Sequence, residues 1–223
     1  MDLHNLPFGI ELAFVIGLSL CLVLYYWLFD HGYLGAQALR TFNQESRKRW
    51  VNAVLKQSGT EILAVQVLRN SIMSATVMAT TCVLLVIAVM SLISDTDKFA
   101  SHWLDAVTVQ GMWRIKVASL LLFIFLSFWH FAQAIRIYGH VGYLLGMPKQ
   151  AGDDSSLHAQ QAISLLNTAG HMFSYGNRYF FFSLALALWW FGVLYLLIGT
   201  ISITLMSWLL DRRALMVSGG IKV

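Results

Sequence analysis

The sequence predicts an all-α integral membrane protein, with four transmembrane helices in a bundle and short interfacial amphipathic helices. Apolar residues make up 58% of the 223 residues and charged residues only 12%, whereas a soluble domain carries about 25% charged residues. Four apolar stretches are each long enough to cross a bilayer, which takes about 20 residues. They lie at 10–29, 69–93, 115–135 and 179–210. Because the intervals between them are too short for a soluble domain, we expect residues 1–223 to form a single helical membrane domain.

Two further segments have the pattern of helices that lie at a membrane surface. Residues 43–56 combine Trp50 with basic residues, which suits the headgroup region, although a solvated loop helix is an equally open interpretation. Residues 156–174 place apolar side chains at helical spacing on one face, and Tyr175-Gly176-Asn177 is expected to end that helix. Within the fourth stretch, Gly192 and Gly199 are small residues that allow close helix contact.

The uneven distribution of Lys and Arg predicts the orientation of the chain. Residues 1–9 contain no Lys or Arg, and residues 94–113 contain Lys98 beside three aspartates. We therefore expect the N terminus outside and the basic loop 30–68 in the cytoplasm. Four spans place the C terminus outside, whereas Lys222 and its basic neighbours favour the cytoplasmic side. The residues that determine this orientation are Arg40, Arg47, Lys48, Arg49 and Lys56 in the basic loop, and Arg212, Arg213 and Lys222 near the C terminus.

The second apolar stretch begins with a polar stripe. Gln66, Asn70, Ser74 and Thr81 recur at helical spacing, so they share one side of a helix. Unpaired polar groups are costly in hydrocarbon, which means that the stripe should face protein partners, a polar cavity or the membrane boundary. The predicted helix is longer than the hydrocarbon layer. Its first turns, including Arg69, are therefore expected at the cytoplasmic interface.

Charged residues mark the predicted cytoplasmic end of each span. If the helices form a bundle, these side chains converge on one face, where arginines can bind phosphate or carboxylate groups. A lipid headgroup, a quinone-like ligand or an anionic metabolite would suit such a pocket. The alternative is a set of positive-inside anchors with one structural ion pair. The candidate ligand- or lipid-binding residues are Asp30, Arg69, Asn70, Arg136 and Arg178.

His130 and Gln133 lie on the same face of the third stretch. A histidine within a span can relay protons or bind a metal or haem, but bis-histidine haem needs a second histidine at matching depth, and the other spans offer none. We therefore favour a hydrogen-bonded structural histidine. The sequence has no H-E-x-x-H, G-x-S-x-G or phosphate-binding glycine loop. We expect no catalytic residues, no metal site and no cofactor.

Residues 62–81, ILAVQVLRNSIMSATVMATT, closely resemble the signature of domain-of-unknown-function family 599, found in bacterial and plant membrane proteins. Residues 136–140, with the GYLLG that follows, and residues 166–181 are similar to the same family. The resemblance covers nearly the whole chain. It implies a four-span fold, which we expect in the bacterial inner membrane, and it implies no established activity.

These observations lead to three hypotheses about function. The first is a non-enzymatic scaffold or accessory subunit of a larger membrane complex, because packing surfaces are abundant and catalytic motifs are missing. The second is a small transporter or channel that uses the polar stripe, and the third is a protein that binds anionic lipid or a quinone. The expected partners are membrane lipids and other membrane subunits or further copies of the chain. Nucleic acid is not expected, because the basic cluster lies beside a membrane helix.

Overall fold

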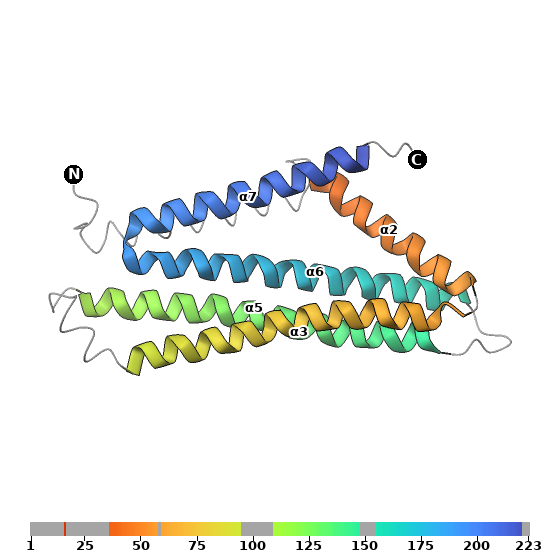
Figure 1. Cartoon of the computed structure of the whole chain (residues 1–223), viewed down its shortest axis with the longest axis horizontal. Helices are drawn as coiled ribbons and strands as arrows, with labels where there is room; N and C mark the ends of the chain where they lie inside the picture. Colours follow the sequence, from red (N-terminus) through yellow and green to blue (C-terminus); the bar gives the residue numbers. More distant parts are fainter. Residues whose placement is uncertain (1–15, 17–35, 58, 95–108, 148–154, 220–223) are drawn as a thin grey trace. The chain divides into compact units, whose positions relative to one another are not determined.

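The computed structural model describes residues 16, 36–57, 59–94, 109–147 and 155–219, and these residues are almost entirely helical. The described part of the chain contains no β-strand, so the predicted all-α class is confirmed there. The first predicted span, 10–29, lies outside the described residues. The elements are α2 (Ala36–Lys56), α3 (Glu61–Ser94), α5 (Val109–Gly146), α6 (Ser155–Leu188), the 3₁₀ turn η1 (Trp189–Phe191) and α7 (Val193–Gly219) (Figure 1).

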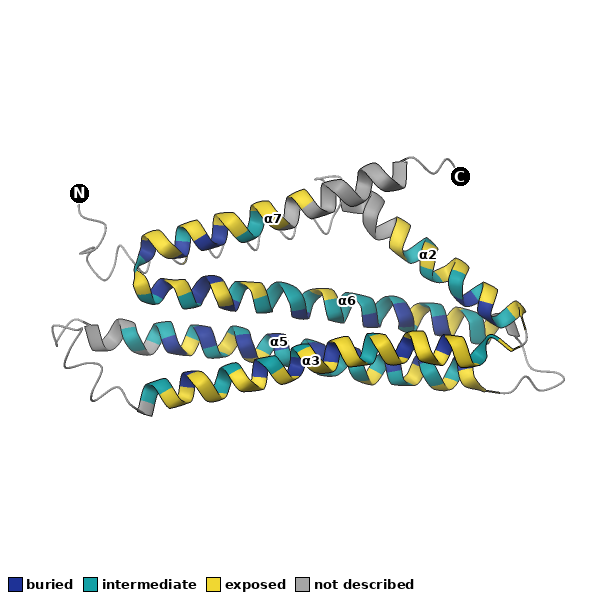
Figure 2. Ribbon diagram, viewed as in Figure 1, coloured by how far each residue is buried: buried dark blue, intermediate teal, exposed yellow. Residues whose placement is uncertain are grey.

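Helices α3 and α5 are long and apolar enough to cross a membrane, over Glu61–Ile93 and Ile115–Gly146. The model describes two such helices rather than the four that the sequence predicts, and α7 contributes a shorter apolar segment, Val193–Met206. In the most apolar part of each long helix, only 17% of the residues of α3 and 28% of those of α5 are buried. Figure 2 shows exposed residues along most of α3. Both helices therefore present apolar surface that the described part of the chain does not cover.

Helix α6 continues without a break through Tyr175, Gly176 and Asn177, so the predicted end of an interfacial helix at this point is wrong. The segment 156–174 belongs instead to a helix of 34 residues. Gly176 is buried within it and lies against the ring of Phe131 on α5, where a Cβ would come within 2.8 Å of Phe131 Cε1. This glycine allows two helices to pack closely, and it does not stop a helix.

The predicted fourth span, 179–210, is divided into two helices by a turn. Gly192 has φ 128° and ψ 165°, a conformation essentially restricted to glycine, and its N–H donates to the carbonyl of Trp189 at 3.0 Å. Beyond the turn, Gly199 lies against Ala185 and Leu188, so α7 runs back along the end of α6 (Figure 1). The stretch is therefore not one continuous helix, because its apolar composition continues through a change of chain direction.

Replacing Gly192 with alanine is expected to destabilise the protein by about 1–3 kcal/mol, since an L-residue is strained at this φ. Thermal unfolding of the purified protein in detergent measures the change. Gly139→Ala is the control, because a Cβ there meets no atom within 4 Å and alanine favours a helix over glycine. Equal unfolding temperatures for the Gly192→Ala variant and the unchanged protein would contradict this account of the turn.

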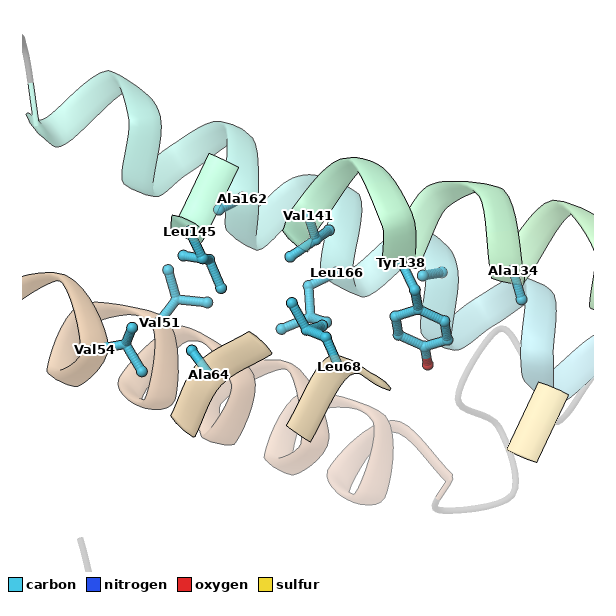
Figure 3. Packing of buried hydrophobic residues seen from close by; sticks show 11 residues of the cluster. Val51, Val54, Ala64, Leu68, Ala134, Tyr138, Val141, Leu145, Ala162 and Leu166 are labelled. Atoms are coloured by element: carbon cyan, nitrogen blue, oxygen red, sulfur yellow. The ribbon is translucent and has the colours of Figure 1, made fainter. Parts of the chain in front are cut away.

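The described helices contribute to two compact units. In the unit formed by residues 43–88 and 123–180, one apolar cluster joins α2, α3, α5 and α6 (Figure 3). Val51 of α2 is fully buried in it, so the predicted interfacial helix 43–56 also packs against other helices. Several members are alanines, which allow the helix backbones to approach closely. The members are Val51, Val54, Ala64, Leu68, Ala134, Tyr138, Val141, Leu145, Ala162, Leu166 and Ala169.

Candidate functional site

A buried polar contact links α3, α5 and α6. The Ser127 hydroxyl donates to the carbonyl of Gly176 at 2.9 Å, and the thiol of Cys82 donates to Ser127 Oγ at 3.4 Å. Cys82 and Ser127 are both fully buried. Because each hydrogen-bonding group here has a partner, the contact fixes the spacing of three helices and leaves no open polar group for chemistry.

His130 lies one turn from this contact and is half-buried. Its Nδ1 is 2.7 Å from the carbonyl oxygen of Leu126 in the preceding turn, so the proton is assigned to Nδ1 and Nε2 is left as an acceptor. The ring lies 5.0 Å from that of Tyr179 and 5.9 Å from that of Tyr175. The structure thus gives His130 the hydrogen bond that a structural histidine requires. Gln133, its predicted neighbour on the same face, is also half-buried.

Arg178 is stacked on Tyr175, with its guanidinium carbon 5.5 Å from the ring centre. It follows Gly176 by two residues and so lies near the level of Ser127. Arg136 is nine residues beyond Ser127 on α5, about 13 Å along the helix. Arg69 is thirteen residues before Cys82 on α3, about 20 Å along that helix. Arg69 and Arg136 are displaced toward the same end of the antiparallel helices α3 and α5, whereas Arg178 is not, so the structure does not bring all three arginines together. Asp30 lies outside the described residues.

The polar stripe of α3 lies on the side of the helix opposite its buried residues. Gln66, Asn70 and Ser74 are exposed, and their side chains form no hydrogen bond with any other described residue. Thr81 is half-buried, and its hydroxyl donates to the carbonyl of Val77 at 2.9 Å, which satisfies it within its own helix. The hydrogen-bonding groups still open in the stripe are therefore those of its first three members.

A shallow groove of about 510 Å³ lies between the end of α5 and the beginning of α6. Its lining mixes apolar and uncharged polar side chains, which offers few constraints on a ligand. Among the residues described, no group of three or more His, Cys, Asp or Glu side chains is close enough to hold a metal ion. The groove is lined by His140, Tyr143, Leu144, Gln161, Ser164 and Leu165.

Sequence reasoning missed two polar residues that the structure places at helix contacts. Ser127 is a single polar residue within an apolar stretch, and only the fold shows that it contacts Gly176. Arg47 was grouped with the other basic residues of its loop, but the structure places it against α6, next to Asn167 and Gly170. Asn167 and Gly170 are three residues apart and share one side of α6, and the sequence contains this spacing. The spacing indicates a contact only when Arg47 is known to lie opposite.

Comparison with known proteins supports the resemblance noted in the sequence. A family model described as "Protein of unknown function, DUF599" matches residues 13–215. No curated protein gives a significant match, and no solved structure does. The family match covers most of the chain and brings no assigned activity with it.

Proposed function

The chain belongs to the DUF599 family, and we propose that it is a non-enzymatic integral membrane protein that serves as a scaffold or accessory subunit of a larger assembly. We place it in the bacterial inner membrane, with its N terminus outside and the basic segment that includes α2 on the cytoplasmic side. The proposal rests on the outer surface of α3, and its membrane location rests on the dimensions of α5.

The charges and tryptophans of α5 match the thickness of a bilayer. Lys116 and Arg136 enclose a stretch without any Asp, Glu, Lys or Arg, which is about 30 Å long at 1.5 Å per residue and equals the hydrocarbon thickness. Near the Lys116 end, the rings of Trp113 and Trp190 are 4.9 Å apart. Lys116 Nζ donates to the carbonyl of Trp189 at 3.3 Å. Tryptophan and lysine are typical of a membrane–water interface. This end is proposed to lie at the outer interface, because the basic helix α2 packs near the other end of α5.

The observation that carries the scaffold proposal is the combination of apolar and amide side chains exposed on α3. Met73 and Val77 are 55% and 64% exposed, and lipid can cover such side chains. Asn70 and Gln66 are exposed beside them without a partner in the described part of the chain. Each amide presents two donors and an acceptor, which another polypeptide can satisfy at the cytoplasmic interface where these residues are expected. This surface therefore favours protein contact along α3.

Transport receives less support from the same residues. The stripe is on the outside of the described helices, so these helices do not enclose a pathway along it. Within them, the contact of Cys82, Ser127 and Gly176 is closely packed and its hydrogen bonds are satisfied. Lipid binding is the second candidate function, and Arg47, a half-buried arginine on α2, favours it.

Photo-crosslinking in native membranes tests the scaffold proposal. A photoreactive residue at Ser74, which is exposed, is compared with one at Ala79, which is 7% exposed and lies on the opposite side of α3. We expect the Ser74 position to give protein adducts heavier than the 25.1 kDa chain, and the Ala79 position to give none. A band at twice the mass of the chain identifies a second copy, and any other mass identifies a different subunit. Adducts with lipid alone at Ser74, at native expression level, would overturn the proposal.

A further inference from the structure

Arg47 differs from its basic neighbours on α2 because its side chain packs against another helix. Its Nη1 donates to Asn167 Oδ1 on α6 at 3.4 Å, and the residue is half-buried. Lys48 and Arg49 are exposed. Arg47 thus holds its charge partly out of water, where a cation without a counter-charge is costly.

The surface of α6 accommodates this guanidinium at a glycine. A Cβ built on Gly170 would lie 2.5 Å from Arg47 Cζ, so the group lies directly over the bare helix backbone. On α5, Tyr138 brings a hydroxyl to the same compact unit. This hydroxyl is the polar end of a side chain that is 8% exposed and belongs to the apolar cluster (Figure 3). The Arg47 guanidinium and the Asn167 amide therefore meet where α2 packs on α6.

No carboxylate of the described residues forms an ion pair with Arg47. The nearest one in sequence, Glu45, pairs with Arg49 at 3.3 Å. A guanidinium has five N–H donors, and the hydrogen bond to Asn167 is a long one that uses a single donor. Within the described residues, the positive charge of Arg47 has no carboxylate partner, and most of its N–H donors have no acceptor side chain.

We propose that Arg47, lying over Gly170 and beside Asn167, binds a phosphate group. The guanidinium fork fits two phosphate oxygens. The remaining oxygens of a tetrahedral anion can accept from the Asn167 amide, whereas the fork uses both oxygens of a carboxylate. Such a phosphate belongs either to the headgroup of an anionic phospholipid or to a free phosphate ion. The lipid source depends on the membrane location proposed above, and the free ion does not.

Thermal unfolding of the full-length protein in non-ionic detergent tests this site. One titration adds sodium phosphate against sodium chloride at equal ionic strength, and the other adds phosphatidylglycerol against phosphatidylcholine. We expect phosphate or phosphatidylglycerol to raise the unfolding temperature, with an apparent affinity that falls about tenfold or more in Arg47→Gln, because charged hydrogen bonds are lost. A response to phosphatidylglycerol alone identifies a lipid headgroup, and a response to both identifies phosphate itself.

Matched variants separate a defined site from general attraction to a basic surface. Gly170→Ala retains every charge but displaces the guanidinium, whose end can move, so we expect affinity to fall severalfold with the fold intact. Arg49→Gln removes an exposed charge, and Gly139→Ala adds a methyl group where no atom lies within 4 Å; both should bind like the unchanged protein. The proposal is overturned if neither titrant stabilises the protein, or if Arg49→Gln weakens binding as much as Arg47→Gln. Either result leaves the crosslinking test at Ser74 unaffected, so the two proposals fail separately.

Discussion

Replacing Gly176 with valine is expected to destabilise the protein by about 3 kcal/mol, at the upper end of the cost of overpacking a core. A Cβ at this position would lie 2.8–3.1 Å from three ring atoms of Phe131. The ring has no room to move, because Phe131 is fully buried and packs edge-on against Phe173 at 5.5 Å. The carbonyl of Gly176 is also held by Ser127. The midpoint of thermal unfolding should fall by roughly 6–12 °C for a chain of this length.

Gly139→Val is the matched control for this prediction, since Gly139 is also within a long helix but its Cβ would meet no atom within 4 Å. We expect this variant to unfold near the temperature of the unchanged protein. A second control uses Phe131→Leu, which makes room at the contact. Combined with Gly176→Ala, it should cost less than the sum of the two single changes, because the residues touch. Additive costs would show that steric contact between these residues is not the cause.

The roles of two glycines show where sequence reasoning about this fold fails. Gly176, between Tyr175 and Asn177, has the composition of a helix stop, yet it lies inside α6 because Phe131 needs the space. Gly192, within an apolar stretch, was predicted to allow close helix contact, yet its φ of 128° turns the chain. At both positions the sequence shows only a glycine between larger residues. The difference depends on which side chain lies opposite, and the sequence does not contain that information.

The candidate site was predictable to the extent that it depends on helical periodicity. The exposed amides of α3 share one side, as their spacing predicts. His130 has the hydrogen bond expected of a histidine on an apolar helix. The predicted arginine pocket depended instead on where each span ends. Arg178 was placed at a span end because the fourth span was predicted to begin at residue 179, whereas the structure places Arg178 inside α6. Arg47 was overlooked for a related reason, since a charge in a basic loop and a charge packed on another helix have the same sequence signature.

A cysteine placed at the C terminus is expected to face the same side of the membrane as the turn between α2 and α3. From that turn, the chain passes through α3 and α5 and then through α6 and α7, which run in opposite directions because the chain reverses at Gly192. Residues 193–210 are uncharged and span about 27 Å, close to the hydrocarbon thickness. If each of these four helices crosses the membrane, the chain returns to its starting side. The basic residues near the C terminus then lie in the cytoplasm, as the positive-inside rule requires.

Labelling with a membrane-impermeant maleimide measures this arrangement in sealed inverted vesicles, with Cys21 and Cys82 replaced by alanine. Cysteines at Gln57 and after Val223 should be labelled, and one at Phe191 in the η1 turn should be protected until detergent is added. Phe191 is 66% exposed, so its protection would report the membrane and not burial within the protein. Protection at Val223 with labelling at Gln57 would instead mean that α6 and α7 together cross once. That outcome would restore a four-span topology with an external C terminus. Arg178 would then lie near a membrane interface and not midway along a crossing by α6.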